Sequence, residues 1–121
     1  MSIKRQANFS EQDFRVALGR FATGVAIVTT TDPETDTPMG LTVSSFNSVS
    51  LDPPMVLWCL RLASKNLELF KNSRHYNIHI LANDQIDLAM QFSTAKVPNR
   101  FEGIDWEFSE TGTPLLSSEY C

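Results

Sequence analysis

Hydrophobic and polar positions near the N-terminus repeat with the period of an α-helix. Five apolar residues spaced three or four positions apart fall on one helical face. They are Phe14, Ala17, Leu18, Phe21 and Ala22. Ser10 is the expected N-cap, and Asp13 follows three residues later in the position of the capping-box acid. Gly24 is expected to end this helix.

The pattern then changes to that of β-strands. The segment Val25–Thr31 is rich in β-branched residues and predicts a strand, and the polar segment Asp32–Thr37 predicts the turn of a hairpin. The next stretch, Pro38–Pro54, alternates hydroxyl and apolar side chains and predicts two strand segments joined near Phe46 and Asn47. The two prolines at its end cannot donate ladder hydrogen bonds, so they should end the second segment.

Apolar runs and caps predict a strand and a short helix next. The segment Met55–Arg61 is nearly all apolar and predicts a central strand covered on both sides, with Trp58 in the core. Ser64 is the expected N-cap of a helix that ends near Asn72. The apolar positions of this helix are Leu67, Leu69 and Phe70.

The segment His75–Leu81 alternates and predicts another strand, with its two histidines on the same face. At about 3.3 Å per residue, His75 and His79 would lie roughly 13 Å apart, too far to chelate one metal. We expect both histidines to be solvated or locally hydrogen-bonded.

The remaining segments predict one more helix and two short strands. Asn83 or Asp84 should cap the helix, and Asp105–Phe108 and Leu115–Cys121 should be strands separated by a turn at Glu110–Pro114. The apolar side of the helix consists of Ile86, Leu88, Ala89, Met90 and Phe92.

Composition narrows the class of protein. The 121 residues fit one domain, 42% are hydrophobic and 20% are charged, as in ordinary globular proteins. A net charge of -4 argues against a nucleic-acid partner, and no apolar run is long enough to span a membrane. The N-terminus is too polar for a signal peptide. Cys59 and Cys121 are far apart and predict reduced thiols in a cytoplasmic protein, and neither a disulfide nor a metal site.

The stretch Pro38–Pro54 is also the first candidate for chemistry. It combines small hydroxyl side chains with Gly40, where the missing Cβ lets another group approach the backbone. Such a surface suits a flat, hydrogen-bonding ligand that carries a phosphate. An ordinary sheet edge rich in serine and threonine explains the same residues, and spacing alone leaves both interpretations open.

The second candidate is the predicted helix start at Ser64. Unpaired N–H groups and partial positive charge at a helix N-terminus stabilise a phosphate. The Ser64 hydroxyl, the amides of Lys65 and Asn66 and the Lys65 ammonium could all reach one. The simpler alternative is that Ser64 only caps the helix, and the two roles are compatible.

As a set, these motifs resemble those of the short flavin reductase-like proteins. The resemblance runs from about Phe9 to Cys121 and implies one flavin reductase-like domain over residues 1–121. Its fold would be mainly β with short helices, an FMN-binding split β-barrel. The segments that carry the resemblance are Phe14–Thr30, Pro38–Pro54, Ser64–Asn66, Phe92, Arg100–Phe101 and Gly112–Leu116.

The resemblance implies a cofactor, FMN or FAD, and a hydride donor, NADH or NADPH. The ring edge would lie along Gly40, Leu41, Thr42 and Val43. The phosphate would be held by Ser44, Ser45, Ser64, Lys65, Asn66 and Arg100. The family often has Arg followed by Ser or Thr where this chain has Lys65 and Asn66. No catalytic side chain is expected, because hydride transfer is the cofactors' own reaction.

The implied function is an NAD(P)H-dependent flavin reductase that supplies reduced flavin to a separate monooxygenase. The resemblance also implies a homodimer with the flavin near its interface. A flavin-binding module without reductase activity is the alternative, and a barrel similar to pyridoxamine-phosphate oxidases or haem-handling proteins is a third interpretation.

The sequence stops before the family's closing strands, which carry a Gly-Asp-His motif associated with nicotinamide binding. Three explanations stay open: a truncated gene product, a sequence that lacks its C-terminal part, or a chain completed by its dimer partner.

Overall fold

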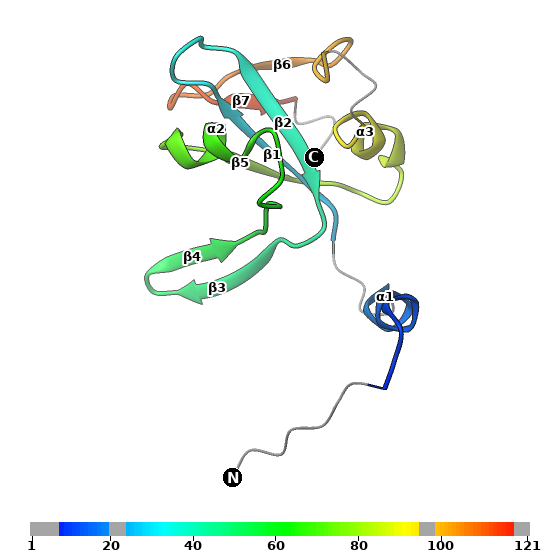
Figure 1. Cartoon of the computed structure of the whole chain (residues 1–121). Coiled ribbons are helices and arrows are strands. Elements are labelled where there is room, and N and C mark those ends of the chain that lie inside the picture. Colours follow the sequence, from blue (N-terminus) through cyan, green and yellow to red (C-terminus); the bar gives the residue numbers. More distant parts are fainter. Residues whose placement is uncertain (1–7, 20–23, 95–98, 118–121) are drawn as a thin grey trace.

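A computed structural model describes residues 8–19, 24–94 and 99–117 of the chain. Short strands dominate these residues and three short helices accompany them, which confirms the predicted class, mainly β with short helices (Figure 1). The elements are α1 (Glu11–Gly19), β1 (Ala26–Thr31), β2 (Pro38–Val43), β3 (Asn47–Leu51), β4 (Pro54–Leu57), α2 (Leu67–Asn72), β5 (Asn77–Ile80), α3 (Ile86–Gln91), β6 (Trp106–Phe108) and β7 (Pro114–Leu116).

Strand β1 is the centre of the main sheet. It pairs antiparallel with β2 on one side and with β5 on the other, in the order β2-β1-β5. All its residues from Ala26 to Thr30 are buried. The predicted hairpin between the strand at Val25–Thr31 and the stretch that begins at Pro38 is therefore confirmed.

Alternation along β1 creates two apolar clusters, one on each face of the sheet. Ile27 points to the face that α3 and the β6–β7 hairpin cover, where Phe92 and Leu116 pack against it. Val28 points to the opposite face and packs with Leu41 and with Trp58. The expectation that Trp58 belongs to the core is confirmed, since its ring also makes edge contacts with Phe70 and Tyr76.

Threonine hydroxyls on β1 hold neighbouring segments in place. Thr29 Oγ1 donates to the carbonyl of Pro114 at 2.6 Å, and Thr31 Oγ1 donates to the carbonyl of Gly112 at 2.7 Å. Gly112 has a φ of +77°, a backbone conformation that favours glycine and allows the tight turn into β7. These bonds attach the β6–β7 hairpin to the face of the main sheet.

The prediction that Met55–Arg61 forms a central strand is wrong. Strand β4 covers only Pro54–Leu57 and pairs with β3 alone, in a two-stranded hairpin that extends away from the main sheet (Figure 1). All four β4 residues are exposed, and Leu51 on β3 is 95% exposed. An apolar run predicts that a strand needs covering, but it does not say which part of the protein covers it.

Helix α1 has the predicted start. The Asp13 N–H donates to Ser10 Oγ at 3.0 Å, and the Ser10 N–H donates to Asp13 Oδ2 at 3.2 Å, which confirms the capping box. Phe14 on its predicted apolar face is half exposed and stacks on Phe9. Ala17 on the same face is exposed, and the Leu18 side chain, Phe21 and Ala22 lie outside the described residues.

The predicted caps of the other two helices are wrong. Helix α2 begins after Asn66 and helix α3 after Gln85, so neither Ser64 nor Asn83 or Asp84 is an N-cap. The reason is local, because polar side chains form turns ahead of each helix. Ser64 Oγ accepts the Asn66 N–H at 3.2 Å, and Gln85 Oε1 accepts the Ala82 N–H at 2.6 Å. On the predicted apolar side of α3, Leu88 and Phe92 are buried, whereas Ile86 and Met90 are exposed.

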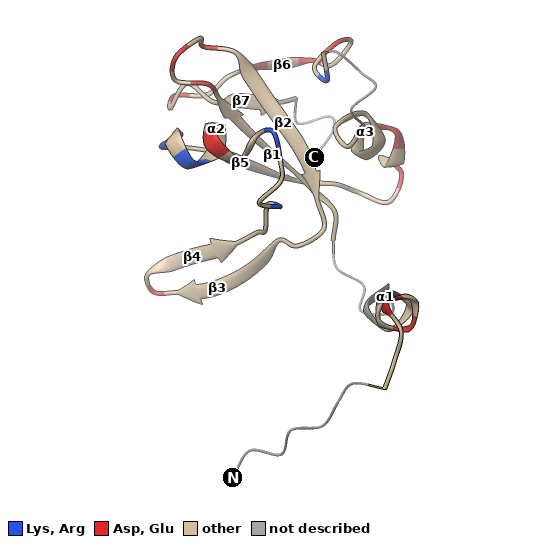
Figure 2. Ribbon diagram, in the orientation of Figure 1, with Lys and Arg blue, Asp and Glu red and all other residues tan. Residues whose placement is uncertain are grey.

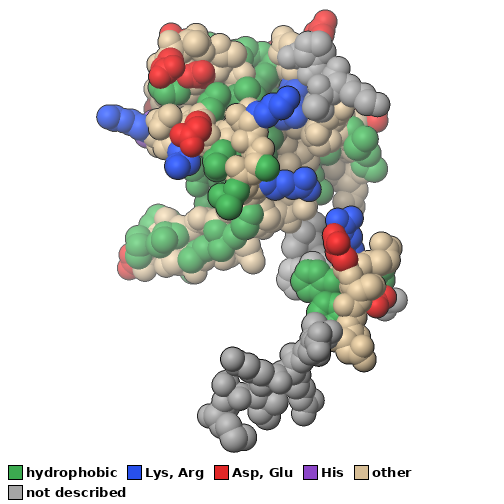
Figure 3. Space-filling model, in the orientation of Figure 1, with side chains coloured by type: hydrophobic (Ala, Val, Ile, Leu, Met, Phe, Trp, Pro, Cys, Tyr) green, Lys and Arg blue, Asp and Glu red, His purple; other side chains and the backbone are tan. Residues whose placement is uncertain are grey.

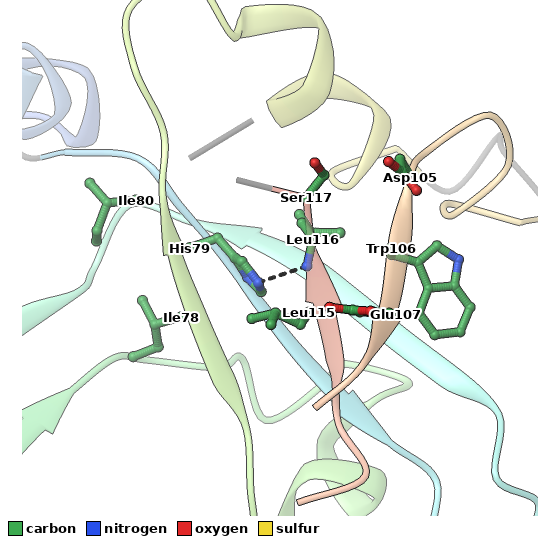
Figure 4. A pocket seen from close by; sticks show the side chains of 9 residues that line it. All are labelled: Ile78, His79, Ile80, Asp105, Trp106, Glu107, Leu115, Leu116 and Ser117. Atoms are coloured by element: carbon green, nitrogen blue, oxygen red, sulfur yellow. Dashed lines mark hydrogen bonds between the residues drawn. The ribbon is translucent and has the colours of Figure 1, made fainter. Parts of the chain in front are cut away.

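The sequence left two alternatives for His79 on β5, solvated or hydrogen-bonded. The structure contradicts the first, because the side chain is buried and hydrogen-bonded within the protein. The ring is 5% exposed and bridges two elements, since Nδ1 lies 3.1 Å from the carbonyl oxygen of Ile27 and Nε2 accepts the Leu116 N–H at 3.1 Å (Figure 4). A carbonyl can only accept and an N–H can only donate, so both bonds require the neutral ring with its hydrogen on Nδ1. Burial lowers the pKa of His79.

This lowered pKa predicts a loss of stability in mild acid. The unfolded chain binds a proton near the ordinary histidine pKa of about 6.5, whereas the folded chain resists it, so unfolding is favoured as the pH falls. The contribution of His79 is complete above about pH 6.5 and is lost as the pH falls from there toward the folded-state pKa. Urea midpoints measured from about pH 7.5 to about pH 5.5 should therefore decline.

A His79→Gln variant keeps one donor and one acceptor but cannot titrate, and it should lose much of this decline. The matched His75→Gln variant changes an exposed histidine and should keep it. A native protein with the same urea midpoint throughout this pH range would contradict the role assigned to His79.

Candidate functional site

A pocket of about 490 Å³ lies beside the outer edge of β2, and we call it the β2 pocket. Three segments that are distant in the sequence form its walls: β2, the connection from β4 to α2, and the chain that follows α3. The lining residues are Leu41, Thr42, Val43, Cys59, Leu60, Arg61, Ala63, Ser64, Asn66, Phe92, Ser93 and Arg100.

The β2 pocket brings together most of the residues predicted to bind a ligand. These are Leu41, Thr42, Val43, Ser64, Asn66 and Arg100. The other four, Gly40, Ser44, Ser45 and Lys65, do not line it. Lys65 is exposed beside the Ser64 turn, and Ser45 Oγ accepts the Cys59 N–H at 2.8 Å, so Ser45 supports a lining residue from behind.

The outer edge of β2 is already hydrogen-bonded within the protein. The Thr42 N–H donates to the Phe92 carbonyl at 3.2 Å, and Thr42 Oγ1 donates to the Ala89 carbonyl at 2.6 Å. The Gly40 carbonyl accepts Arg100 Nη1 at 2.9 Å. The expectation that exposed backbone amides of this stretch face a ligand therefore does not hold for the Thr42 amide.

Gly40 allows a close approach, but the approaching group is a side chain of the protein. A Cβ at this position would lie 2.7 and 2.8 Å from two carbons of the Phe92 ring, closer than packed atoms can be. Phe92 in turn makes an edge contact with Phe101 in the buried cluster. The glycine thus lets the chain after α3 pack tightly on β2 and form one wall of the pocket.

Arg100 is fixed by backbone carbonyls. Besides the bond to Gly40, its Nε donates to the Thr94 carbonyl at 3.3 Å, and Gln91 Nε2 donates to the Arg100 carbonyl at 2.7 Å. Partial burial lowers the pKa of Arg100, but a guanidinium stays charged at any physiological pH. Its positive charge therefore remains at the pocket wall.

Six lining residues were not predicted to bind a ligand: Cys59, Leu60, Arg61, Ala63, Phe92 and Ser93. Arg61 was missed because it ends an apolar run that predicted a buried strand, and nothing in that pattern indicates a position in the pocket wall. Among the residues that the structure describes, the lining contains Arg61 and Arg100 and no carboxylate, although the chain has a net charge of -4. Basic positions lie in the connection between β4 and α2 in Figure 2, and basic side chains lie on this face of the molecule in Figure 3. The β2 pocket is therefore suited to an anion.

A larger cavity of about 750 Å³ lies between β5 and the β6–β7 hairpin (Figure 4). His79, Asp105, Trp106 and Glu107 contribute to its walls, and none of the predicted binding residues does. Among the described residues, its acidic side chains are Asp105 and Glu107 and it has no lysine or arginine, a setting that disfavours a phosphate. We therefore take the smaller β2 pocket as the candidate site.

In the part of the chain that the structure describes, no group of three or more potential metal ligands occurs. None of the described helices combines the length and apolar character needed to cross a bilayer.

Comparison with known proteins gives one consistent result. A family model described as "Flavin reductase like domain" matches residues 18–120. The chain is 43% identical over 107 residues to the FMN reductase (NADH) SmoA of Agrobacterium fabrum, covering 88% of this chain and 59% of that protein.

Two solved structures show the same fold. The nitrilotriacetate monooxygenase component B from Mycobacterium thermoresistibile superimposes with a TM-score of 0.80 at 36% identity, covering 88% of this chain and 57% of that one. The NADH:FAD oxidoreductase SgcE6 of Streptomyces globisporus, in complex with NAD and FAD fragments, gives a TM-score of 0.74 at 30% identity, covering 93% and 68%. The chain spans only 34–59% of the length of the first relatives that it matches.

The contact between Gly40 and Phe92 predicts a cost for any side chain at position 40. Gly40→Ala should lower the free energy of unfolding by about 1–3 kcal/mol, because the added methyl overpacks against the ring. The measurement is urea denaturation, with Gly24→Ala as the matched control, since a Cβ at Gly24 meets nothing within 4 Å.

The Phe92→Leu background makes this test specific. If the ring causes the cost, Gly40→Ala should destabilise the Phe92→Leu protein less than it destabilises the native one. An equal cost in both backgrounds would show that the ring is not what restricts position 40.

Proposed function

Because the chain belongs to the family of flavin reductase like domains, we propose that residues 1–121 form one such domain with NAD(P)H-dependent flavin reductase activity. The reaction would transfer a hydride from NADH or NADPH to FMN or FAD. The reduced flavin would then serve a separate monooxygenase. The flavin would bind in the β2 pocket.

The observation that carries this proposal is the convergence of three sequence segments on one pocket with a positive wall. Leu41 and Val43 come from β2, Ser64 and Asn66 from the turn before α2, and Arg100 from the chain after α3. A flavin nucleotide combines a flat, largely apolar ring with an anionic phosphate. The pocket offers apolar side chains, hydroxyl and amide groups, and cations within one space.

The residues divide between the two parts of the ligand. Leu41, Thr42 and Val43 would lie along the ring. Ser64, Lys65, Asn66 and Arg100 would bind the phosphate through hydroxyl, ammonium, amide and guanidinium groups. Gly40 would contribute indirectly, because it lets the Phe92 ring pack against β2. Ser45 would also contribute indirectly, by accepting the Cys59 N–H. Ser44 is exposed where β2 ends.

The bound flavin would supply the redox chemistry, since it accepts the hydride. The protein's part is to hold the flavin in one orientation, which converts a bimolecular encounter into a step within a complex. Positive charge near the ligand would also favour the electron-rich reduced form. SmoA is named an FMN reductase (NADH) and SgcE6 an NADH:FAD oxidoreductase. These names support a nicotinamide nucleotide as the hydride donor and FMN or FAD as the flavin.

A homodimer is part of the proposal because of the β3–β4 hairpin. Its large side chains are exposed along both strands, and apolar side chains are prominent there in Figure 3. An exposed apolar hairpin favours association with another surface. The residues concerned are Val49, Leu51, Met55, Val56 and Leu57.

A monooxygenase partner and a cytoplasmic location complete the proposal. One structural relative is named as a component of a monooxygenase, which supports an oxygenase as the consumer of the reduced flavin. Cys59 is an exposed free thiol, as is usual in a reducing compartment such as the cytoplasm.

Steady-state oxidation of NADH and NADPH, with and without added FMN or FAD, tests the proposal. We expect oxidation that depends on flavin. Retention of flavin without NAD(P)H oxidation would contradict the reductase and favour a flavin-binding module. A protein that neither binds flavin nor oxidises NAD(P)H faster when flavin is added would contradict both functions.

A charge variant tests the site. Ser64→Asp places a carboxylate in the pocket and should weaken FMN binding by at least about tenfold through repulsion of the phosphate. Thr35→Asp adds the same charge in the exposed β1–β2 turn and should leave FMN affinity close to native. Equal affinities of both variants, measured by quenching of flavin fluorescence, would place the phosphate elsewhere.

A further inference from the structure

The two guanidinium groups of the β2 pocket are in different states. Arg100 donates to the backbone carbonyls of Gly40 and Thr94 and is partly buried. Arg61 is exposed at the pocket wall; its backbone carbonyl accepts the Ser64 N–H at 2.9 Å, but its guanidinium makes no hydrogen bond or ion pair with any residue that the structure describes. One guanidinium is therefore committed to holding the fold together, and none of the described residues uses the donors of the other.

The charge around Arg61 is not balanced locally. No carboxylate of the described residues lines the pocket, and the second charged lining group is another cation, Arg100. Two like charges beside one cavity raise the free energy of the empty site, and an anion between them lowers it. The acidic groups that give the chain its net charge of -4 lie outside this pocket.

The groups next to Arg61 fit one class of anion. Ser64 and Asn66 lie on the same connection between β4 and α2 and line the same pocket, so a hydroxyl and an amide share this cavity with the guanidinium. A guanidinium presents planar paired donors that match two oxygens of a phosphate. This combination favours a phosphate ester over a neutral ligand.

We propose that Arg61 is the principal phosphate-binding residue of the β2 pocket and makes the site selective for phosphorylated flavin over riboflavin. This inference rests on the proposed function, because it concerns the same ligand and the same pocket. It changes the division of roles, since Arg100 then contributes mainly by bracing the wall. Arg61 was absent from the residues expected to bind a ligand.

The test compares FMN with riboflavin, which has the same ring and ribityl chain but no phosphate. Both are titrated against the native protein and Arg61→Ala, with flavin fluorescence as the readout. We expect Arg61→Ala to lose about tenfold in affinity for FMN and to keep its affinity for riboflavin. Arg61→Lys, which keeps the charge but not the paired donors, should fall between the two.

Arg74→Ala is the matched control, because Arg74 is also an exposed arginine but does not line the pocket. It should bind both flavins as the native protein does. Added salt should weaken FMN binding to the native protein more than to Arg61→Ala, since the variant lacks the cation that salt screens.

The possible failures point to different errors. If the native protein binds FMN but Arg61→Ala binds it equally well, or loses FMN and riboflavin in equal measure, the phosphate role of Arg61 is wrong and the flavin site stands. If the native protein binds neither flavin, the proposed function itself is wrong, and the role of Arg61 is wrong with it.

Discussion

The structure depends on the burial of β1 from Ala26 to Thr30. A strand buried on both faces leaves no water for its polar groups, so each one needs a partner inside the protein. The β2 and β5 ladders satisfy its backbone, and the hydroxyls of Thr29 and Thr30 donate to the carbonyls of Pro114 and His75. The need to satisfy these groups is what brings the β6–β7 hairpin and the segment before β5 onto the central sheet.

The same requirement shapes the candidate site at the outer edge of β2. The outer edge of β2 has no further strand beside it among the described residues, and the chain after α3 takes that place through the Phe92 carbonyl and the Arg100 side chain. Gly40 permits this contact because a side chain there would collide with the Phe92 ring. The β2 pocket lies where the chain after α3 no longer covers the edge of β2 and the turn at Ser64 forms another wall. The contact that satisfies the open edge of β2 therefore also places the positive charge of Arg100 in the pocket wall.

The sequence predicted what depends on neighbours along the chain. The capping box at Ser10 and Asp13 and the hairpin from β1 to β2 are confirmed because their causes lie within a few residues. The resemblance predicted the family, which the comparisons confirm, and six of the ten residues that it named for flavin binding line the β2 pocket.

The errors concern what distant segments decide. The apolar segment from Met55 predicted a covered strand but forms an exposed hairpin, because periodicity measures the need for burial and not its location. His79 alternates like a surface residue, yet the carbonyl of Ile27 and the amide of Leu116 enclose it. Arg61 was overlooked for the same reason, since only the folded chain places it in the wall of the same pocket as Arg100.

The central claim is that the β2 pocket binds the phosphorylated flavin. The most direct measurement is a titration of the ¹⁵N-labelled protein with FMN, followed through the backbone amide resonances. The account predicts that the largest changes occur at Val43, Arg61, Ser64 and Asn66, while Ile80, Leu115 and Ser117 beside the larger cavity stay unchanged. Changes centred on the larger cavity, or no changes at saturating FMN, would contradict it.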